Sequence, residues 1–248
     1  MSIYAVNGKE PIAAWIPSLD TAGNGTTTLT DLVGSNNGTL TNMDAATDWV
    51  SDTSNGGVRA LDFSGGLNKG VIASSSAINA ERGTISCWMK PTNWVTLFPS
   101  IFSMRSSVGS DIIEVYRNGT NWVFRYGDIT NGSSFDGAYL DAWQHIVVAW
   151  DNAVGRYAWV NGVQKLNQAG AWEAPLSDGD FVIGAADTSP LSQGPDSLQD
   201  DIRTFDVVLD STDIAYLYNS GNGRGIVVES APSAIYHPFA SLKHPLSI

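Results

Sequence analysis

The stretch Tyr157-Ala-Trp-Val-Asn-Gly-Val163 decides how this chain folds. Its first half, Tyr157–Val160, is rich in aromatic and β-branched residues, which favour strands. Asn161-Gly162 follows at once, and this pair is a strong signal for a two-residue hairpin turn because both residues tolerate a positive φ. The preceding run Gln144–Trp150 has the same strand-forming composition. The sequence therefore predicts antiparallel strands joined by tight turns.

The same pattern continues outward in both directions. Asn118-Gly119 separates Ile112–Tyr116 from Trp122–Tyr126 and predicts a second hairpin. Many short strands with Gly and Asn turns are typical of an all-β, two-sheet antiparallel sandwich or jelly roll. Strands are expected near 13–16, 58–63, 70–73, 83–90, 99–104, 111–117, 121–126, 143–151, 156–161, 180–184 and 199–206.

One short C-terminal helix interrupts the β pattern. Asp210 or Ser211 can cap its first turn by accepting backbone N–H groups, and Asp213 lies near the positive end of the helix dipole. Ile214, Leu217 and Tyr218 form its apolar face, and Gly221 is expected to end it.

The chain changes character near its C-terminus, so that residues 1–225 are expected to form the jelly roll and 226–248 an extended arm. The arm is apolar and contains prolines, with Glu229 and Lys243 as its charged residues. Apolar segments of this kind seldom stay exposed to water. We expect the arm to dock, either on its own domain or on a partner, through Ile226, Val228, Tyr236, Phe239 and Leu246.

Charge and composition exclude several function classes. The chain has 248 residues and a formal net charge of −12, so it lacks the clustered cations that nucleic acids and anionic membranes attract. Its 25 acidic residues are mostly aspartate, which favours turns and cation-binding loops over helices. The single Cys87 permits no intrachain disulfide and fits a buried, unreactive thiol.

The sequence shows neither a signal peptide for export nor a segment that could span a membrane. Residues 1–20 hold no basic segment followed by an apolar run, and no stretch approaches 18 apolar residues. We therefore expect a protein on the surface of a virus particle, or one that leaves a bacterium by a non-classical route.

Several motifs, in order along the chain, resemble one known family. They include Asp31-Leu-Val-Gly-Ser-Asn-Asn-Gly-Thr-Leu40, Gly83-Thr-Ile-Ser-Cys-Trp-Met-Lys-Pro-Thr92, Trp143-Gln-His-Ile-Val147 and Asp200-Asp-Ile-Arg203. This set is similar to the laminin-G-like or concanavalin A-like jelly rolls of bacterial and phage proteins, over about residues 13–220. Two departures stand out: Ser197-Leu198-Gln199 replaces a glycine that usually precedes the Asp-Asp-x-Arg segment, and the arm 226–248 lies outside the family pattern.

The resemblance implies a structural calcium ion. Family members of this type often hold one near the Asp31 loop and the Asp-Asp-x-Arg segment, which selects Asp31, Asn36 and Asp200 as candidate ligands. Calcium takes oxygen ligands from flexible loops, so the residue types are suitable. The alternative is that these side chains only stabilise turns by bonding to nearby backbone.

A glycan-binding face is the second candidate. Sugars are held by stacking on aromatic rings together with a few polar groups. Trp49, Trp94 and Trp172 lie in predicted loops, and Tyr139 stands beside Phe135-Asp136-Gly137. The alternative is that the loop tryptophans are lids over the core.

Catalytic patterns are absent from the sequence. The glutamates are isolated, so the paired carboxylates of a Glu-x-Asp-x-x-Glu glycosidase strand do not occur. No serine-hydrolase, zinc-protease or phosphate-loop motif occurs either. His145 lies within a predicted strand and fits a core histidine, while His237 and His244 each precede a proline in the arm. The sequence favours a protein that is not an enzyme.

These observations favour a non-catalytic display or adhesion protein with a lectin-like head, which decorates a bacteriophage virion or its tail. Its partners would be capsid or tail proteins, further copies of itself, and a polysaccharide or cell-surface glycan. One alternative is a carbohydrate-binding module of a bacterial polysaccharide-degrading system. A hydrolase or lyase that uses aspartate pairs is a third.

Overall fold

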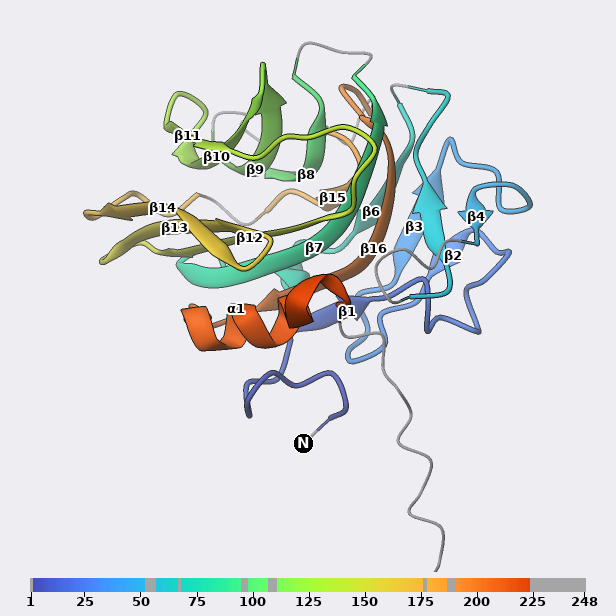
Figure 1. Ribbon diagram of the computed structural model, residues 1–248, viewed down its shortest axis with the longest axis horizontal. Coiled ribbons are helices and arrows are strands. Elements are labelled where there is room, and N and C mark those ends of the chain that lie inside the picture. Colours follow the sequence, from blue (N-terminus) through green and yellow to red (C-terminus); the bar gives the residue numbers. More distant parts are fainter. Residues whose placement is uncertain are drawn as a thin grey trace, which may run out of the picture.

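The chain folds as a two-layer antiparallel β-sandwich with one α-helix outside it (Figure 1). The computed structural model describes residues 2–51, 57–66, 68–94, 98–106, 111–175, 178–186 and 191–223, without the side chain of Asp111. The predicted all-β, two-sheet jelly-roll architecture is confirmed. The anchoring residues expected between 226 and 248 lie outside the described residues.

Sheet 1 is built around its longest strand, β7 (Arg82–Asn93), which runs between β12 and β16. The strand order is β14-β13-β12-β7-β16-β5-β4, and β1 pairs with β16. The bounds are β14 Val163–Ala169, β13 Gly155–Val160, β12 Gln144–Asp151, β16 Asp196–Phe205, β5 Ala60–Asp62, β4 Trp49–Val50 and β1 Ala13–Trp15.

Sheet 2 faces sheet 1 and has the order β11-β10-β9-β8-β15-β6-β3-β2. Strands from the first third of the chain join strands from its middle through β15, which lies between β8 and β6. The bounds are β11 Gly132–Asp136, β10 Asn121–Asp128, β9 Asp111–Asn118, β8 Ser100–Arg105, β15 Phe181–Ile183, β6 Gly70–Ala73, β3 Gly38–Thr41 and β2 Thr28–Leu29.

The alternation along β12 shows how the layers are held together. Ile146, Val148 and Trp150 point between the sheets into the main hydrophobic core. Val147 and Ala149 point the other way and pack against the helix in a second apolar cluster. Because side chains of a strand alternate between its faces, a strand covered on both sides reads as one continuous apolar run.

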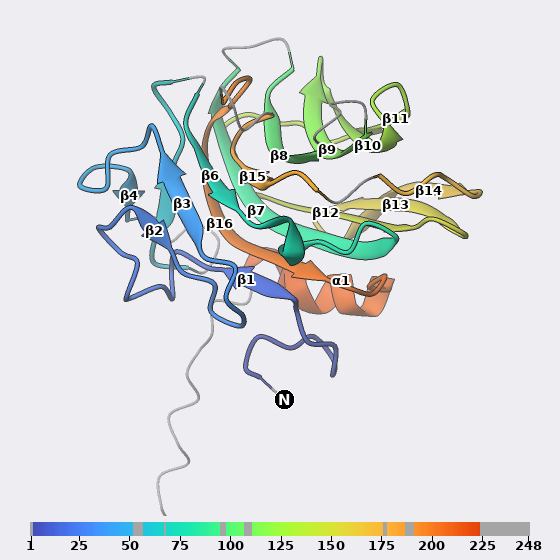
Figure 2. The same ribbon diagram turned by 180° about the vertical axis from the view of Figure 1, so that it is seen from behind.

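The helix α1 (Ser211–Tyr218) covers the outer face of sheet 1, on the side away from sheet 2 (Figures 1 and 2). Asp210, one of the two residues predicted as its cap, caps the helix and forms a capping box with Asp213. The helix ends three residues before the predicted Gly221, because Asn219 adopts a left-handed conformation with φ 48°. A 3₁₀ turn (Asn219–Gly221) follows.

The predicted hairpin at Asn161-Gly162 is present between β13 and β14. Gly162 has φ 76°, and a Cβ atom there would lie 2.9 Å from the ring of Tyr218. A glycine is therefore needed for both the turn and the close approach of α1. None of the described helices is long and apolar enough to cross a membrane.

Candidate functional site

Four loops gather at one end of the sandwich, where β7, β9, β11 and β13 end. We call this the aromatic end and define it by Trp94, Phe98, Trp122, Tyr139 and Leu140. Tyr139 is 59% exposed, Leu140 45% and Phe98 41%, which places them among the most exposed large apolar residues described. Exposed apolar side chains on neighbouring loops make this end the candidate site.

Contacts through Trp122 and Gln144 connect the ring of Trp94 with the backbone of Tyr139, two of the predicted glycan-binding residues. The ring of Trp94 packs edge-on against Trp122, with 5.8 Å between centroids. The indole N–H of Trp122 is 3.2 Å from the carbonyl of Gly137 and 3.4 Å from Oε1 of Gln144. The buried Gln144 in turn donates to the carbonyl of Tyr139 at 2.6 Å. Gln144 thus fixes the loop that presents Tyr139.

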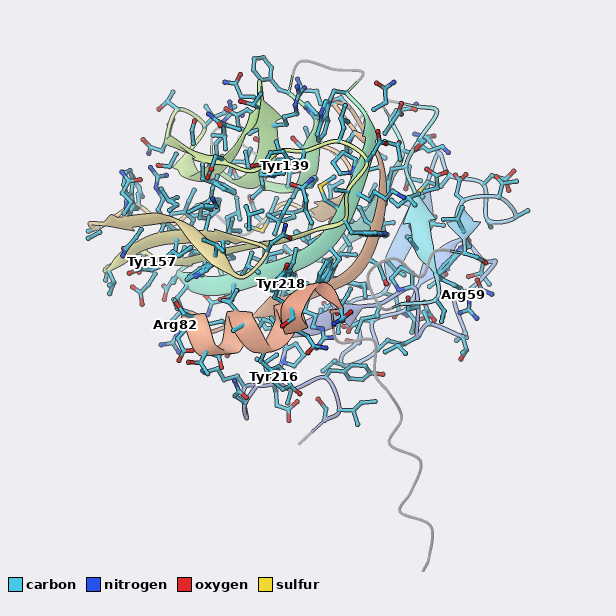
Figure 3. All side chains as sticks on the ribbon, in the orientation of Figure 1. Arg59, Arg82, Tyr139, Tyr157, Tyr216 and Tyr218 are labelled. Carbon is cyan, nitrogen blue, oxygen red and sulfur yellow. The ribbon has the colours of Figure 1, made fainter. Side chains whose placement is uncertain are left out.

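Trp94 and Tyr139 differ in how much of each ring is available. The guanidinium of Arg117 lies over the Trp94 ring, 4.4 Å from its centroid, and burial lowers the pKa of Arg117 from its ordinary value. This cation–π contact covers one face of the indole. The ring of Tyr139 contacts no other aromatic ring in the described part of the chain. The ring of Tyr139 is therefore the more accessible of the two, and Figure 3 labels its position.

The structure places Trp172 at the opposite end of the sandwich, which we call the clamped end. The guanidinium of Arg156 lies 3.8 Å from the centroid of the Trp172 ring. Arg156 also donates to Oε1 of Gln168 at 3.0 Å and to the carbonyl of Asn131 at 2.6 Å. Arg156 is 2% exposed, and burial lowers its pKa. Trp172 therefore works as a lid, the alternative role considered for the loop tryptophans.

A small hollow of about 100 Å³ adjoins the clamped end. It holds two carboxylates, but Oδ1 of Asp128 accepts both the backbone N–H and the hydroxyl of Thr130 at 2.7 Å. These bonds lower the pKa of Asp128, and they bind its carboxylate to the turn in which it lies. The lining residues are Gly127, Asp128, Asn131, Glu173 and Ala174.

Trp49 lies on the short edge strand β4 and joins the two sheets there. Its indole N–H donates to the carbonyl of Thr26 at 3.0 Å, just before β2 of the other sheet. Its ring packs against the main core. The four predicted aromatic residues thus occupy three different places, and the structure brings together only Trp94 and Tyr139.

The predicted calcium ligands are already engaged in hydrogen bonds. Oδ1 of Asp31 accepts the backbone N–H groups of Ala14 and Val33 at 3.0 and 3.1 Å. Oδ2 accepts the backbone N–H of Asn36 at 3.0 Å and its side-chain amide at 3.4 Å. A carboxylate offers about four lone-pair sites. Asp31, so arranged, has none left for a cation and does not fit a calcium ligand.

Asp200 serves a different part of the structure. Its carboxylate accepts the hydroxyl of Ser18 at 2.7 Å and the backbone N–H of Asp201 at 2.8 Å. Among the described residues, no group of three or more His, Cys, Asp or Glu side chains is placed to hold a metal ion. The geometry agrees with the alternative that these residues stabilise turns.

Glu114 is the most deeply buried glutamate described and lies on the outer face of sheet 2, at 1% exposure. Its carboxylate is 2.9 Å from Nη1 of Arg125 and 3.9 Å from Arg105, and it accepts the Ser100 hydroxyl. The residues paired with Glu114 on the neighbouring strands are Ser103 and Arg125. The strands beside Glu114 therefore offer it cations and a hydroxyl in place of a second carboxylate.

His145 and Cys87 belong to the interior, as predicted. His145 is fully buried, with Nε2 2.8 Å from the Ser86 hydroxyl, and its ring stacks on Trp88 and Tyr218. Burial, with a smaller effect from Arg203, lowers the pKa of His145 to about 3. Burial also raises the pKa of the Cys87 thiol well above its ordinary value, which keeps it unreactive.

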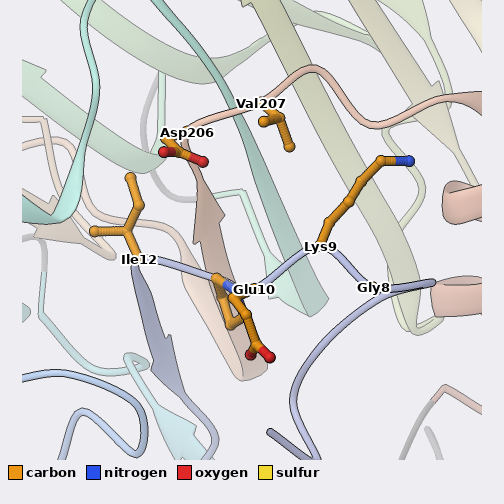
Figure 4. A pocket seen from close by; sticks show the side chains of 7 residues that line it. Gly8, Lys9, Glu10, Ile12, Asp206 and Val207 are labelled. Carbon is orange, nitrogen blue, oxygen red and sulfur yellow. The ribbon is translucent and has the colours of Figure 1, made fainter. Parts of the chain in front are cut away.

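An open hollow of about 440 Å³ lies beside the N-terminal segment (Figure 4). Two of its charged residues are engaged, because Lys9 pairs with Asp213 at the start of α1 and Glu10 accepts the backbone N–H of Ser2 at 2.8 Å. The lining residues are Gly8, Lys9, Glu10, Pro11, Ile12, Asp206 and Val207. These contacts fasten the N-terminal segment to the helix, so we assign the hollow a structural role.

Sequence reasoning missed Phe98, Leu140, Trp122 and Gln144 as members of the aromatic end. Phe98 and Leu140 carry a usable signal, since each is a large apolar residue in a loop. Trp122 and Gln144 look like ordinary strand residues, and only the packing shows that they support the loop of Tyr139.

A family model described as the concanavalin A-like lectin/glucanases superfamily matches residues 63–215, more than half of the chain. No curated protein sequence matches the chain. Similarity to solved structures is confined to the fold, since sequence identity is low in each case.

One such structure is domain 4 of AbnA, an extracellular arabinanase from Geobacillus stearothermophilus, in complex with arabinotriose. Its TM-score is 0.62 at 16% identity, covering 84% of this chain and 98% of that domain. Another is the sialidase of Trypanosoma rangeli in complex with 2,3-difluorosialic acid, with TM-score 0.62 at 12% identity. That match covers 83% of this chain and 32% of the sialidase, so the chain spans about a third of that protein.

Proposed function

Since this chain belongs to the concanavalin A-like lectin/glucanase superfamily, we propose that it is a non-catalytic glycan-binding protein whose binding surface is the aromatic end. The observation that carries the proposal is the exposed ring of Tyr139, held on a loop fixed by Gln144. Exposed aromatic rings beside polar groups suit the flat apolar faces of sugar rings. Asn93, Asn118 and Asp141 are exposed at the same end and supply polar groups for sugar hydroxyls.

The absence of catalysis is part of the proposal. A glycosidase places two carboxyl groups on either side of the scissile bond. Glu114 is the buried glutamate on the outer face of sheet 2, and its paired neighbours are Ser103 and Arg125. Its carboxylate is held by ion pairs with Arg125 and Arg105. This arrangement supports a structural role for Glu114.

The proposal is tested by affinity electrophoresis of the full chain in gels that contain soluble polysaccharides. Wild type should be retarded by at least one polymer, and Tyr139→Ala should lose about tenfold or more of that affinity. Tyr157→Ala is the matched control, because Tyr157 lies on β13 away from the aromatic end. Equal retardation of the Tyr139 and Tyr157 variants would reject this surface, and no retardation by any polymer would reject glycan binding.

We further propose that the arm 226–248 attaches this head to a larger assembly, on a virion surface or on another extracellular particle. The support is its apolar, proline-containing sequence, which would be costly to leave in water. The test compares the molar mass and solubility of the full chain with those of residues 1–225. Self-association or insolubility of the full chain alone is expected, whereas two equally soluble monomers would contradict the role of the arm.

A further inference from the structure

We infer that the aromatic end takes neutral glycans, and that Asp141 is the residue that excludes acidic sugars. This inference rests on the proposed function and names the class of ligand for the same surface. It is argued from the distribution of charge around Tyr139.

The loops of the aromatic end contain a single charged residue. Their described residues are 94, 98–99, 119–120, 137–143 and 161–162, and Asp141 is the only Asp, Glu, Lys or Arg among these. Asp141 is exposed, and its backbone has a left-handed φ of 57°. Its own N–H donates to the carbonyl of Pro91 at 2.8 Å, which fixes the loop against the end of β7. An exposed carboxylate therefore stands two residues from the stacking ring of Tyr139.

Two cations on strands that reach this end are engaged with other side chains. Arg117 stacks on Trp94, and Lys165 pairs with Asp136 at 3.1 Å. An acidic sugar at Tyr139 would therefore meet an exposed carboxylate with no cation of these loops to offset it. The formal charge of the chain, −12, adds a repulsive field of the same sign.

A neutral sugar meets none of this repulsion. The carboxylate of Asp141 can accept hydrogen bonds from two neighbouring hydroxyl groups, and bonds to a charged acceptor are about twice as strong as neutral ones. Stacking on Tyr139 depends on the apolar face of the sugar and is independent of charge. The two residues together thus favour a neutral polysaccharide and penalise a uronic or sialic acid polymer.

The test uses affinity electrophoresis with neutral polymers (arabinan, mannan, mixed-linkage glucan) and anionic ones (polygalacturonate, alginate, polysialic acid). The proteins are the full-length wild type, Asp141→Asn, Asp141→Lys and Tyr139→Ala. Runs at about 0.15 M and about 1 M NaCl change the Debye length from about 8 Å to about 3 Å. Tyr139 and Asp141 are both exposed, so the variants should fold, and circular dichroism verifies this, above all for Asp141→Lys, where lysine must adopt a left-handed φ.

Wild type should bind a neutral polymer with the same affinity at both salt concentrations and no anionic polymer at the lower one. Asp141→Lys should gain anionic binding at the lower salt, about tenfold or more, which disappears at the higher salt. Wild-type binding of anionic polymers alone would overturn the inference and leave glycan binding intact. No gain in Asp141→Lys would also overturn it, whereas no retention of any polymer by any variant would reject the proposed function itself.

Discussion

The two ends of the sandwich use the same pair of side chains for different purposes. Each has a loop tryptophan under an arginine, Trp94 with Arg117 at the aromatic end and Trp172 with Arg156 at the clamped end. Arg156 also makes hydrogen bonds to two other loops or strands, whereas Nε of Arg117 is buried without a partner. At the end that holds Arg117 the loops expose Tyr139, and at the end that holds Arg156 Trp172 packs against the core.

The difference teaches that an arginine–tryptophan pair does not by itself identify a ligand site. What separates the ends is how the surrounding polar groups are used. At the clamped end they bond to one another, as with Ser133 and Gln168 at 2.5 Å. At the aromatic end several remain exposed beside an exposed ring. The first arrangement stabilises the fold, and the second is suited to a ligand.

Acid is expected to give the largest effect, and it acts where β12 begins, beside the aromatic end. His145 is neutral in the folded protein, with a pKa of about 3, but takes up a proton near pH 6.5 when unfolded. The unfolded state therefore binds more protons between these values, and the free energy of unfolding should fall by about 1.4 kcal/mol per pH unit as pH drops below 6.5.

Urea unfolding at a series of pH values measures this slope. His145→Gln has no titratable ring, so its slope should be shallower by about one proton than that of wild type. Parallel slopes for the two proteins would show that His145 is not held neutral. In that case the start of β12, beside the aromatic end, would not be packed tightly enough to exclude water from His145.

Replacing the two arginines should sharpen the contrast between the ends. Arg156→Met removes the charged donor from the Asn131 carbonyl and from the Gln168 amide oxygen, together with the cation–π contact to Trp172, and should lower the free energy of unfolding by about 2–4 kcal/mol. Arg117→Met removes mainly a cation–π contact and should cost about 1 kcal/mol or less. Chemical denaturation of both variants checks the order, and equal costs would remove the distinction.

A variant of the Asp31 loop tests whether a bound cation also stabilises the sandwich. Asp31→Asn should lower the free energy of unfolding by about 1–3 kcal/mol, since an amide cannot accept four N–H groups. Chelation should leave the melting temperature of wild type unchanged, because only a ligand of the native state raises it. A lower melting temperature in EDTA, restored by calcium, would contradict this assignment.

The smallest effect is expected at Tyr139 itself. Tyr139→Ala should change the free energy of unfolding by no more than about 0.5 kcal/mol, because the ring is 59% exposed. The same variant should lose glycan binding, so that this one substitution changes binding and leaves the free energy of unfolding almost unchanged. A large loss of stability, measured by thermal unfolding, would show that the ring supports the loop instead.

The sequence alone predicted the strands that are buried on both faces, and it missed those at the edges. Ile146–Trp150, within β12, is continuously apolar because the second sheet covers one face and α1 the other. Val163–Ala169 forms the edge strand β14, whose side chains are mostly exposed, so its polar sequence has no apolar alternation to detect. Gly132–Asp136, at the edge of the other sheet, was missed for the same reason.

The candidate site was less predictable, because loop position does not reveal what a side chain contacts. Trp49, Trp94 and Trp172 all looked alike in the sequence, and each is occupied by a different neighbour in the fold. Asp31 likewise has the residue type of a calcium ligand, but its surroundings are backbone N–H groups brought from β1 and its own loop. These partners are set by tertiary packing, which local patterns do not encode.

Because β1 pairs with β16, sheet 1 can be completed only late in the synthesis of this protein. Strand β16 lies between β7 and β5 in the middle of sheet 1, and it is the last strand described along the chain. A ribosome must therefore synthesise more than 200 residues before Ala13 meets Thr204 and the sheet can close. Contacts this distant in sequence slow folding and leave strand edges exposed meanwhile. The nascent chain is thus expected to depend on chaperones until its last strand emerges.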